Sequence, residues 1–327
     1  MALLSISVGI LLLWFGGTYF VRGSVAIAHR LHVSELMIGL TLVGFGTSLP
    51  ELVTSMGAAL SDSPGLAVGN VVGSNIANIL LILGLVAFVR PFACNMASFY
   101  RDALALSAAT LVGVIVILNG SIGIAHGVAM LAALTAYIAF AYVTEQKTPH
   151  TDGNAASIET SPAFSSSPAA PSSSTAPPIL LIGTWVVVGL AAVIAGAWLL
   201  IEGAIELATF WGVSKTFIGL TVVAVGTSVP ELMITLIAAL RGQSDIALGN
   251  VIGSNIFNLL GILGLTSVVT TIDVPADLKA LDLAAMALAA AALIAVAGLR
   301  KHFGRVSGAV FVALYLAYTL GRTQFAA

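Results

Sequence analysis

The chain has 327 residues, of which 59% are hydrophobic and only 8% are charged, and this excludes a pair of soluble globular domains. Its formal net charge is -2, so no basic surplus is available to neutralise phosphates and no nucleic-acid partner is expected. Cys94 is the single cysteine, which excludes an internal disulfide and a metal site built from several thiolates. The composition is that of a membrane protein.

Apolar stretches recur along the chain at the length of about 20 residues that a helix needs to cross a bilayer. The first stretch carries no positive residue before it, so we interpret it as a retained helix and not as a cleaved signal. The pattern predicts ten transmembrane helices, at residues 2–21, 34–60, 65–89, 102–119, 121–143, 179–201, 213–240, 245–270, 279–299 and 305–321.

Residues 145–178 are rich in Ser, Ala and Pro and predict a disordered linker between two five-helix repeats, residues 1–144 and 179–327. An odd number of crossings makes the two repeats enter the membrane from opposite sides. If the N-terminus is outside, nine of the 12 basic residues lie on the inner face. This bias predicts a multi-pass protein of the inner or plasma membrane, with both termini outside and the linker in the cytoplasm.

The chain contains an internal repeat. Residues 39–84 align with residues 219–264 at a constant offset of 180, and 26 of the 46 positions are identical by direct count. With five crossings in each half, the copies are expected to be related by a pseudo-two-fold axis in the membrane plane. Many secondary transporters have this architecture.

Each repeat places one carboxylate, Glu51 or Glu231, near the middle of an apolar span. An ionised carboxylate at that depth costs at least about 2.5 to 3.5 kcal/mol, so it needs a compensating partner. The nearest basic residues, Arg241 and Lys215, lie at helix ends. We therefore expect the missing positive charge to be a bound cation or a proton.

A proline precedes each of these carboxylates, as Pro50 or Pro230. Proline lacks an N–H and crowds the preceding turn, so it predicts a broken helix with backbone carbonyls freed around Gly46 and Gly226. Such a break is tolerated at membrane depth only where it is buried in protein or lines a cavity. A threonine also lies four residues before each Glu and would share its helical face, as Thr47 and Thr227.

A second motif in each copy, Gly-Asn-x-x-Gly-Ser-Asn-Ile-x-Asn, supplies neutral oxygens one turn apart. These are Ser74 with Asn78 and Ser254 with Asn258. The combined donor set holds no His and no Cys, so it suits hard cations such as Ca²⁺, Na⁺ or Mg²⁺. Two carboxylates neutralise one divalent ion, and Mg²⁺ avoids all-protein cages, so Ca²⁺ is favoured.

The paired motifs GTSLPE with GNVVGSNIAN and GTSVPE with GNVIGSNIFN resemble the alpha-repeats of the Ca²⁺/cation antiporter superfamily, above all its prokaryotic sodium/calcium exchanger branch. This resemblance implies an all-α membrane fold of ten transmembrane helices in two inverted five-helix repeats. It also implies that the first and sixth helices form a long, tilted pair that slides past the remainder.

The same resemblance implies a diamond of metal-binding positions where the second, third, seventh and eighth helices meet. Its acidic ligands would be Glu51 and Glu231. The oxygens around them would come from Thr47, Ser48, Thr227, Ser228, Ser74, Asn78, Ser254 and Asn258, and from the backbone carbonyls of Gly44 and Ala224.

One position departs from part of this family. Several members carry Asp where this chain has Asn258, so the site here holds at most two formal charges. Potassium co-transport is therefore not favoured, and the stoichiometry and the choice between Na⁺ and H⁺ coupling stay open.

We hypothesise a secondary active antiporter that exchanges Ca²⁺ for Na⁺ by alternating access. The alternative within transport is a Ca²⁺/H⁺ exchanger that uses the same carboxylates. From another class, an intramembrane enzyme with a carboxylate pair as acid and base is a remote alternative, and a cation channel is disfavoured. No enzymatic activity and no cofactor are expected. The expected partners are Ca²⁺, Na⁺ or H⁺ and membrane lipid. The sequence does not decide the oligomeric state and is compatible with a monomer.

Overall fold

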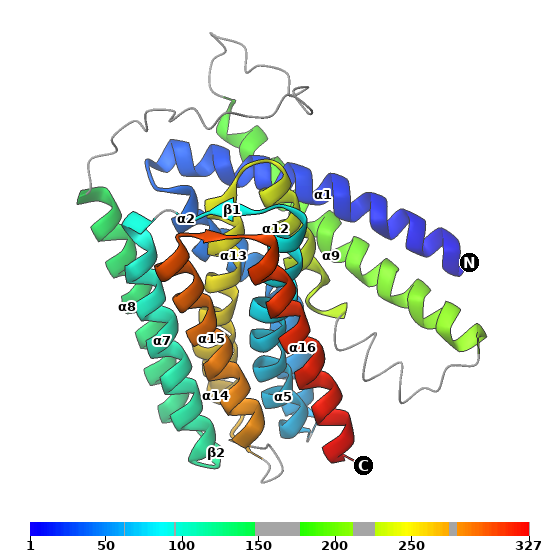
Figure 1. Ribbon diagram of the computed structural model, residues 1–327, viewed down its shortest axis with the longest axis vertical. Coiled ribbons are helices and arrows are strands. Elements are labelled where there is room, and N and C mark those ends of the chain that lie inside the picture. The colour runs from blue at the N-terminus through cyan, green and yellow to red at the C-terminus, as the bar shows by residue number, and fades with distance from the viewer. Residues whose placement is uncertain (62, 95, 148–176, 212–225, 275–279, 327) are drawn as a thin grey trace.

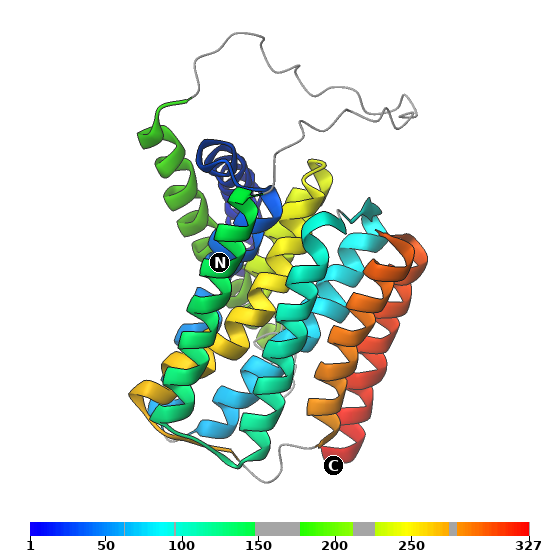
Figure 2. The same cartoon turned by 90° about the vertical axis from the view of Figure 1, so that its left-hand side faces the viewer.

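The computed structural model describes residues 1–61, 63–94, 96–147, 177–211, 226–274 and 280–326. In these ranges the protein is a bundle of helices, most of which run side by side (Figures 1 and 2). Seven of the described helices are long and apolar enough to cross a membrane, and a further bent pair raises this number to eight. The helical membrane architecture is therefore confirmed, while the count of ten crossings stays a prediction.

The first half follows the predicted order of spans. Its long first helix is longer than expected and its fifth helix runs three residues into the expected linker; residues 148–176 of that linker lie outside the described ranges. The elements are α1 (Ala2–Leu31), α2 (Glu35–Ile38), η1 (Gly39–Val43), α3 (Gly44–Thr47), α4 (Leu49–Leu60), α5 (Pro64–Ile76), η2 (Ala77–Leu83), α6 (Gly84–Val89), α7 (Met96–Leu118) and α8 (Ile124–Lys147).

The second half begins at the predicted residue with a helix that is again longer than expected. The N-terminal part of the predicted span 213–240 lies outside the described residues. The described elements are α9 (Ile179–Phe210), α12 (Val229–Leu240), α13 (Ser244–Ile256), η4 (Phe257–Ile262), α14 (Leu263–Val269), α15 (Ala280–Arg300) and α16 (Arg305–Ala326).

The predicted helix breaks are present before both carboxylates. Ser48 leaves helical geometry with φ -83° and ψ 8°, and Ser228 does so with φ -90° and ψ 7°. In the first half the two helical pieces meet at an angle of 45°. Pro50 and Pro230 each stand in the first turn of the helix that follows, where the absent N–H leaves no bond unmade.

Among the described residues, three segments widen into π-helical turns, η1, η2 and η4, which the sequence did not indicate. Asn78 lies in η2 and Asn258 lies in η4. A π-turn inserts one residue into the helical ladder and re-aims the side chains around it, and such turns concentrate at functional sites. Both amides of the second motif thus stand at irregular backbone.

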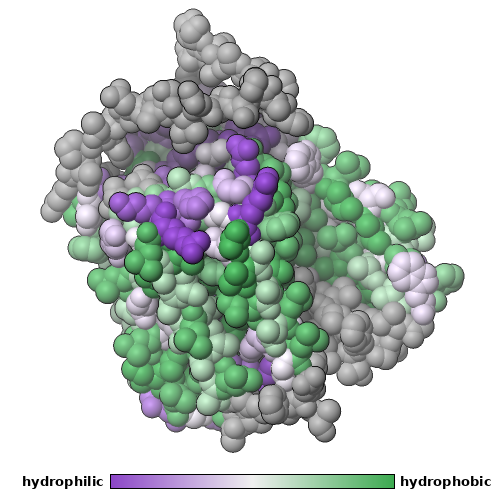
Figure 3. All heavy atoms as spheres, viewed as in Figure 1, coloured by the Kyte–Doolittle hydropathy of each residue, from purple (hydrophilic) through white to green (hydrophobic). Residues whose placement is uncertain are grey.

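Two central helices form the core of the bundle. Every residue of α13 from Ile246 to Ile256 is buried, and α5 continues through η2 and α6 as a second largely buried span. Surrounding helices present apolar side chains outward, for example Leu104 with 72% and Val306 with 72% of the side chain exposed. Figure 3 shows the resulting hydrophobic flank, with hydrophilic residues gathered near one end. Such a flank is the surface that lipid contacts.

The long helices α1 and α9 pack antiparallel along their length beside the bundle (Figure 1). Glycines allow this close approach: a Cβ on Gly9 would lie 2.8 Å from the carbonyl oxygen of Gly196, and one on Gly16 would lie 2.8 Å from that of Gly189. Gly189 and Gly196 follow Gly9 and Gly16 at the same offset of 180. The internal repeat therefore extends to the first helix of each half.

Two short antiparallel ladders modify the expectation of a purely α-helical protein. Strand β1 (Phe92–Ala93) pairs with β4 (His302–Phe303), and β2 (Ser121–Ile122) pairs with β3 (Ile272–Asp273). Each ladder joins a connection of the first half to one of the second half. Strands of two residues are too short to leave a pattern in the sequence, so they form only because the helix ends meet.

Candidate ion-binding site

The two carboxylates of the repeat motifs meet at the centre of the molecule. Glu51 is 0% exposed and Glu231 is 1% exposed. Ser48 donates a hydrogen bond to Oε1 of Glu231 at 3.0 Å, and Ser228 donates one to Oε1 of Glu51 at 3.2 Å. Each serine lies three residues before the Glu of its own motif and bonds the Glu of the other motif. The two helix breaks therefore lie against each other.

Neither carboxylate has a basic partner within the described residues. The ion pairs there involve other acids, such as Asp102 with Arg101 and Asp282 with Arg322. The second oxygen of each central carboxylate, Oε2 of Glu51 and of Glu231, is buried and accepts no hydrogen bond from a described residue. A buried carboxylate is normally paired or fully hydrogen-bonded, so this pair is suited to receive a cation.

The threonines of the two motifs have different surroundings. Thr47 donates to Oδ1 of Asn250 at 3.0 Å, and its hydroxyl also lies 3.4 Å from that of Ser254. Ser254 in turn donates to the carbonyl oxygen of Gly44 at 3.2 Å. By contrast, the buried hydroxyl of Thr227 has no hydrogen-bond partner among the described residues. The other predicted carbonyl ligand, Ala224, lies outside the described ranges.

The amides of the second motif lie on the segments that face these carboxylates. The η2 segment, which carries Asn78, packs against α12, and the η4 segment, which carries Asn258, packs against α4. Both polar atoms of the Asn78 side chain are buried without a described partner; Asn258 donates to Asn75 at 3.4 Å, and its Oδ1 accepts nothing. Ser74 is buried one turn before Asn78 on the same span. Amide oxygens without a described hydrogen-bond partner thus lie on segments that pack against the helices carrying the two acids.

Two further asparagines, to which no role was predicted from the sequence, support the site. Asn70 donates to the hydroxyl of Ser55 at 2.9 Å and to the carbonyl oxygen of Glu51 at 3.3 Å. Asn250 makes the same pair of bonds in the other half, to Thr235 at 2.9 Å and to the carbonyl oxygen of Glu231 at 3.3 Å. The signal that could have identified them is their recurrence at the offset of 180, with a hydroxyl residue one turn after each Glu.

The donor set has the chemistry of a hard-cation site. The described ranges hold no group of three or more His, Cys, Asp and Glu side chains that could form a metal centre. Instead, two carboxylates are combined with hydroxyl, amide and carbonyl oxygens, which are the ligands that Ca²⁺ and Na⁺ accept.

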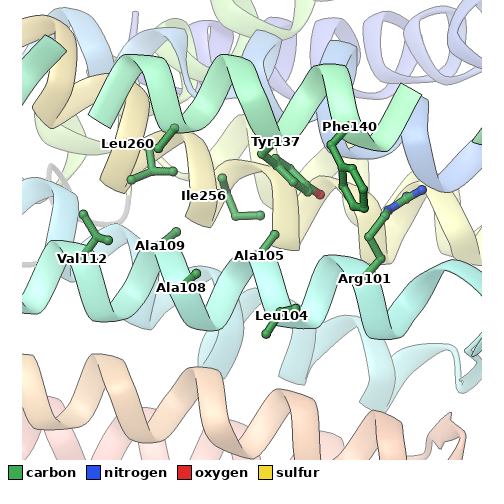
Figure 4. A pocket seen from close by; sticks show the side chains of 11 residues that line it. Arg101, Leu104, Ala105, Ala108, Ala109, Val112, Tyr137, Phe140, Ile256 and Leu260 are labelled. Carbon is green, nitrogen blue, oxygen red and sulfur yellow. The ribbon is translucent and has the colours of Figure 1, made fainter. Parts of the chain in front are cut away.

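A groove on the flank of the bundle is separate from this site. It lies between α7 and α8, has a volume of about 240 Å³ and is lined mainly by apolar side chains, including Ala109, Val112 and Leu260 (Figure 4). Arg101 and Tyr137 stand at one end of it. Neither Glu51 nor Glu231 contributes to its wall.

The chain resembles known proteins over nearly its whole length. The sequence profile of a family described as "Sodium/calcium exchanger protein" matches residues 1–143 and 182–324. CaxA of Alkalimonas amylolytica is 34% identical over 97% of both chains. The sodium/calcium exchanger MaX1 of Methanosarcina acetivorans is 33% identical over 81% of this chain and 82% of its own.

A solved structure agrees with the fold. The sodium-calcium exchanger NCX_Mj, in a form soaked with zero Na⁺ and Ca²⁺, superimposes with a TM-score of 0.80 over 97% of both chains at 31% identity. These relatives are transporters and not enzymes. The profile, the relatives and the fold together establish that this chain belongs to the sodium/calcium exchanger family.

Proposed function

We propose that the protein is a secondary active antiporter that exchanges Ca²⁺ for Na⁺ across the cell membrane by alternating access. The observation that carries the proposal is the pair Glu51 and Glu231, both fully buried, bridged through each other's serine, and without a basic partner in the described ranges. The proposed ligands around them are the oxygens of Thr47, Ser48, Thr227, Ser228, Ser74, Asn78, Ser254, Asn258, Gly44 and Ala224.

We place these groups in a frame of ten transmembrane helices arranged as two inverted repeats, with both termini outside. The supporting observations are contacts that recur at the offset of 180. The Asn70 and Asn250 hydrogen bonds are one pair of this kind, and the glycine contacts of α1 and α9 are another. Inverted repeats place the binding site at the bilayer midplane, where the two copies meet.

The buried charge explains why transport would be coupled and not a leak. An unloaded pair of ionised carboxylates would have to pass through a closed, dry state in which charge is expensive. One Ca²⁺, several Na⁺ or protons remove this cost by neutralising Glu51 and Glu231. Only loaded forms then cross the barrier readily, which converts one ion gradient into another.

Charge balance makes the stoichiometry measurable. Exchange of three Na⁺ for one Ca²⁺ moves one net charge, worth about 2.3 kcal/mol per 100 mV of membrane potential. An inside-negative potential would then help to expel Ca²⁺. Exchange of two Na⁺ for one Ca²⁺ would be electroneutral and insensitive to the potential.

The different surroundings of the two motifs support alternating access. Thr47 is hydrogen-bonded to the neighbouring repeat, whereas Thr227 has no partner among the described residues. In a transporter built from two inverted repeats, the outward-facing and inward-facing states can differ in which repeat makes a given set of contacts. The arrangement seen here would be one of these two states.

The test is Ca²⁺ uptake into proteoliposomes with an imposed Na⁺, K⁺ or H⁺ gradient. We expect uptake to follow the Na⁺ gradient and to be lost in Glu51→Gln and in Glu231→Gln. The exposed acid Glu202 offers a matched control as Glu202→Gln. Uptake that is independent of every gradient, or unchanged in both central variants, would refute antiport through this site.

Ca²⁺/H⁺ exchange is the second candidate, and the same carboxylates motivate it. Each Glu is buried without a basic partner in the described residues, so a proton could neutralise it in place of Na⁺. Uptake driven by a pH gradient in Na⁺-free vesicles would identify this coupling. Uptake that needs Na⁺ at constant pH would exclude it.

A further inference from the structure

A second polar site, whose lining includes neither Glu51 nor Glu231, lies between the C-terminal part of α1 and the start of α9. It is a pocket of about 710 Å³ that opens at the end of this helix pair. Its walls combine basic and apolar side chains. The lining residues used below are Arg22, Val25, His29, Arg30, Ile182 and Trp185.

The basic half of the pocket holds two exposed arginines. Arg22 lies over the ring of Trp185, with 4.3 Å from its guanidinium carbon to the ring centroid. Arg30 makes one contact, at 3.5 Å, from Nη1 to the carbonyl oxygen of Pro177. Among the described residues neither arginine forms an ion pair with a carboxylate. Most of their N–H donors are therefore available to a ligand, and the exposed His29 adds a further donor.

The remaining wall of the pocket is apolar. Ile182 is 1% exposed, and Val25 and Trp185 are half-buried beside it. The pocket therefore changes from cationic to apolar across its width. This gradient matches a phospholipid, in which a phosphate is joined to acyl chains, and does not match a free inorganic anion, which offers nothing to the apolar wall.

We propose that this pocket binds the headgroup phosphate of an anionic phospholipid, with an acyl chain packed against Val25, Ile182 and Trp185. Arginine binds phosphate oxygens through several N–H groups at once, and the stacking of Arg22 on Trp185 holds one guanidinium in place. Basic pockets between transmembrane helices select anionic headgroups in this manner. Because residues of both α1 and α9 line the pocket, the lipid would bridge the two long helices.

The proposal does not rest on ion exchange, so its test measures lipid binding directly. The full-length protein in detergent is titrated with phosphatidylglycerol or phosphatidylcholine, and bound lipids are counted by native mass spectrometry. Each basic residue near the headgroup raises the affinity between about five- and six-fold. The double variant Arg22→Gln with Arg30→Gln, which lacks two such residues, should therefore bind the first phosphatidylglycerol about 30-fold more weakly. Phosphatidylcholine should show no comparable tight site.

A matched control removes two other arginines, with the exposed Arg300 and Arg305 replaced as Arg300→Gln and Arg305→Gln. This variant has the same net charge as the test variant, and its affinity for phosphatidylglycerol should equal that of the unmodified protein. Equal losses in both variants would reduce the effect to overall charge and overturn the proposal. So would equal affinity of the test variant and the unmodified protein.

Two further measurements complete the test. One asks whether the bound phosphate belongs to a lipid or is a free anion, and the other asks whether charge at these two positions is sufficient for binding. Inorganic phosphate at millimolar concentration should not displace the lipid; displacement would indicate a free-anion site and overturn the assignment. The variant Arg22→Lys with Arg30→Lys keeps both charges but lacks the stacked, forked guanidinium groups, so its affinity should lie between that of the glutamine variant and that of the unmodified protein. A loss there equal to that of the glutamine variant would show that the retained charge contributes nothing, and it would overturn the proposal.

Discussion

The two repeats share 26 of 46 aligned residues, yet they are packed differently. In the first half the broken helix lies directly on α13: a Cβ on Gly44 would lie 2.9 Å from the backbone nitrogen of Ser254, and one on Gly253 would collide with the carbonyl oxygen of Leu40. On α5, the equivalent Gly73 has no described atom within 4 Å of such a Cβ. The same sequence motif therefore makes a tight helix contact in one half, whereas in the other half no described residue meets it at this glycine; Leu220, the counterpart of Leu40, lies outside the described residues.

We infer from this difference that the motif specifies a helix surface able to make a close contact, and not the contact itself. Glycine at these positions allows backbones to approach without a side chain between them. Under the proposed alternating access, both copies would need to keep this ability, because each would make the close contact in one of the two states. Substitutions at equivalent positions of the two halves can therefore be used to test whether the asymmetry is real.

Gly253→Ala is expected to have the largest effect on stability among such pairs. Its methyl group would meet backbone atoms of Leu40, which cannot move aside as a side chain can, and overpacking of this kind costs about 1 to 3 kcal/mol or more. Gly73→Ala should be neutral or slightly stabilising, because no described atom would meet the methyl group and alanine favours helix. Thermal unfolding of the purified protein in detergent measures both. Equal destabilisation of the two variants would contradict the asymmetry.

Asn250→Ala should destabilise the protein more than Asn70→Ala. Asn250 is fully buried and accepts from Thr47 in addition to the two bonds that it donates, whereas Asn70 is half-buried and accepts no bond from a described residue. A buried polar group left without its partner costs about 1 to 3 kcal/mol. Unfolding midpoints of the two variants in the same detergent test this order. A larger loss in Asn70→Ala would mean that the first-half amide carries the tighter network.

Of the three pairs of variants, Thr47→Val and Thr227→Val should differ least in their free energy of unfolding. We expect Thr47→Val to lower it by about 1 kcal/mol and Thr227→Val to leave it almost unchanged. The reason is that only Thr47 has hydrogen-bond partners among the described residues. If both hydroxyls are ion ligands, the two variants should nevertheless lose Ca²⁺ affinity alike. Calorimetric Ca²⁺ titration of each separates these effects, and loss of affinity only in Thr47→Val would remove Thr227 from the ligand set.

The features that the sequence predicted well are those imposed by local chemistry. The breaks at Ser48 and Ser228 follow from proline, which lacks an N–H, and the burial of the two acids follows from their place in apolar spans. The first helix was expected to end before Arg22. It continues to Leu31, because Arg22 is accommodated on Trp185 and the chain turns only at His32, which has φ 53°.

The features that the sequence did not predict depend on tertiary contacts. The π-turn at Asn78 and the ladder that pairs Phe92 with Phe303 arise from how neighbouring elements meet. Asn70 and Asn250 are identical residues in identical motifs, and only the packing of the adjacent helices gives Asn250 its third bond. Identical motifs therefore cannot indicate which copy makes the additional hydrogen bond.

Ca²⁺ binding by Glu51 and Glu231 can be measured directly on the purified protein by isothermal titration calorimetry. We expect one Ca²⁺ per chain in the unmodified protein and in the control Glu202→Gln. In Glu51→Gln and in Glu231→Gln the affinity should fall more than about 100-fold, because removal of one partner from a buried charge cluster costs about 3 to 5 kcal/mol. Unchanged binding after both central carboxylates are replaced together would contradict Ca²⁺ binding at this pair.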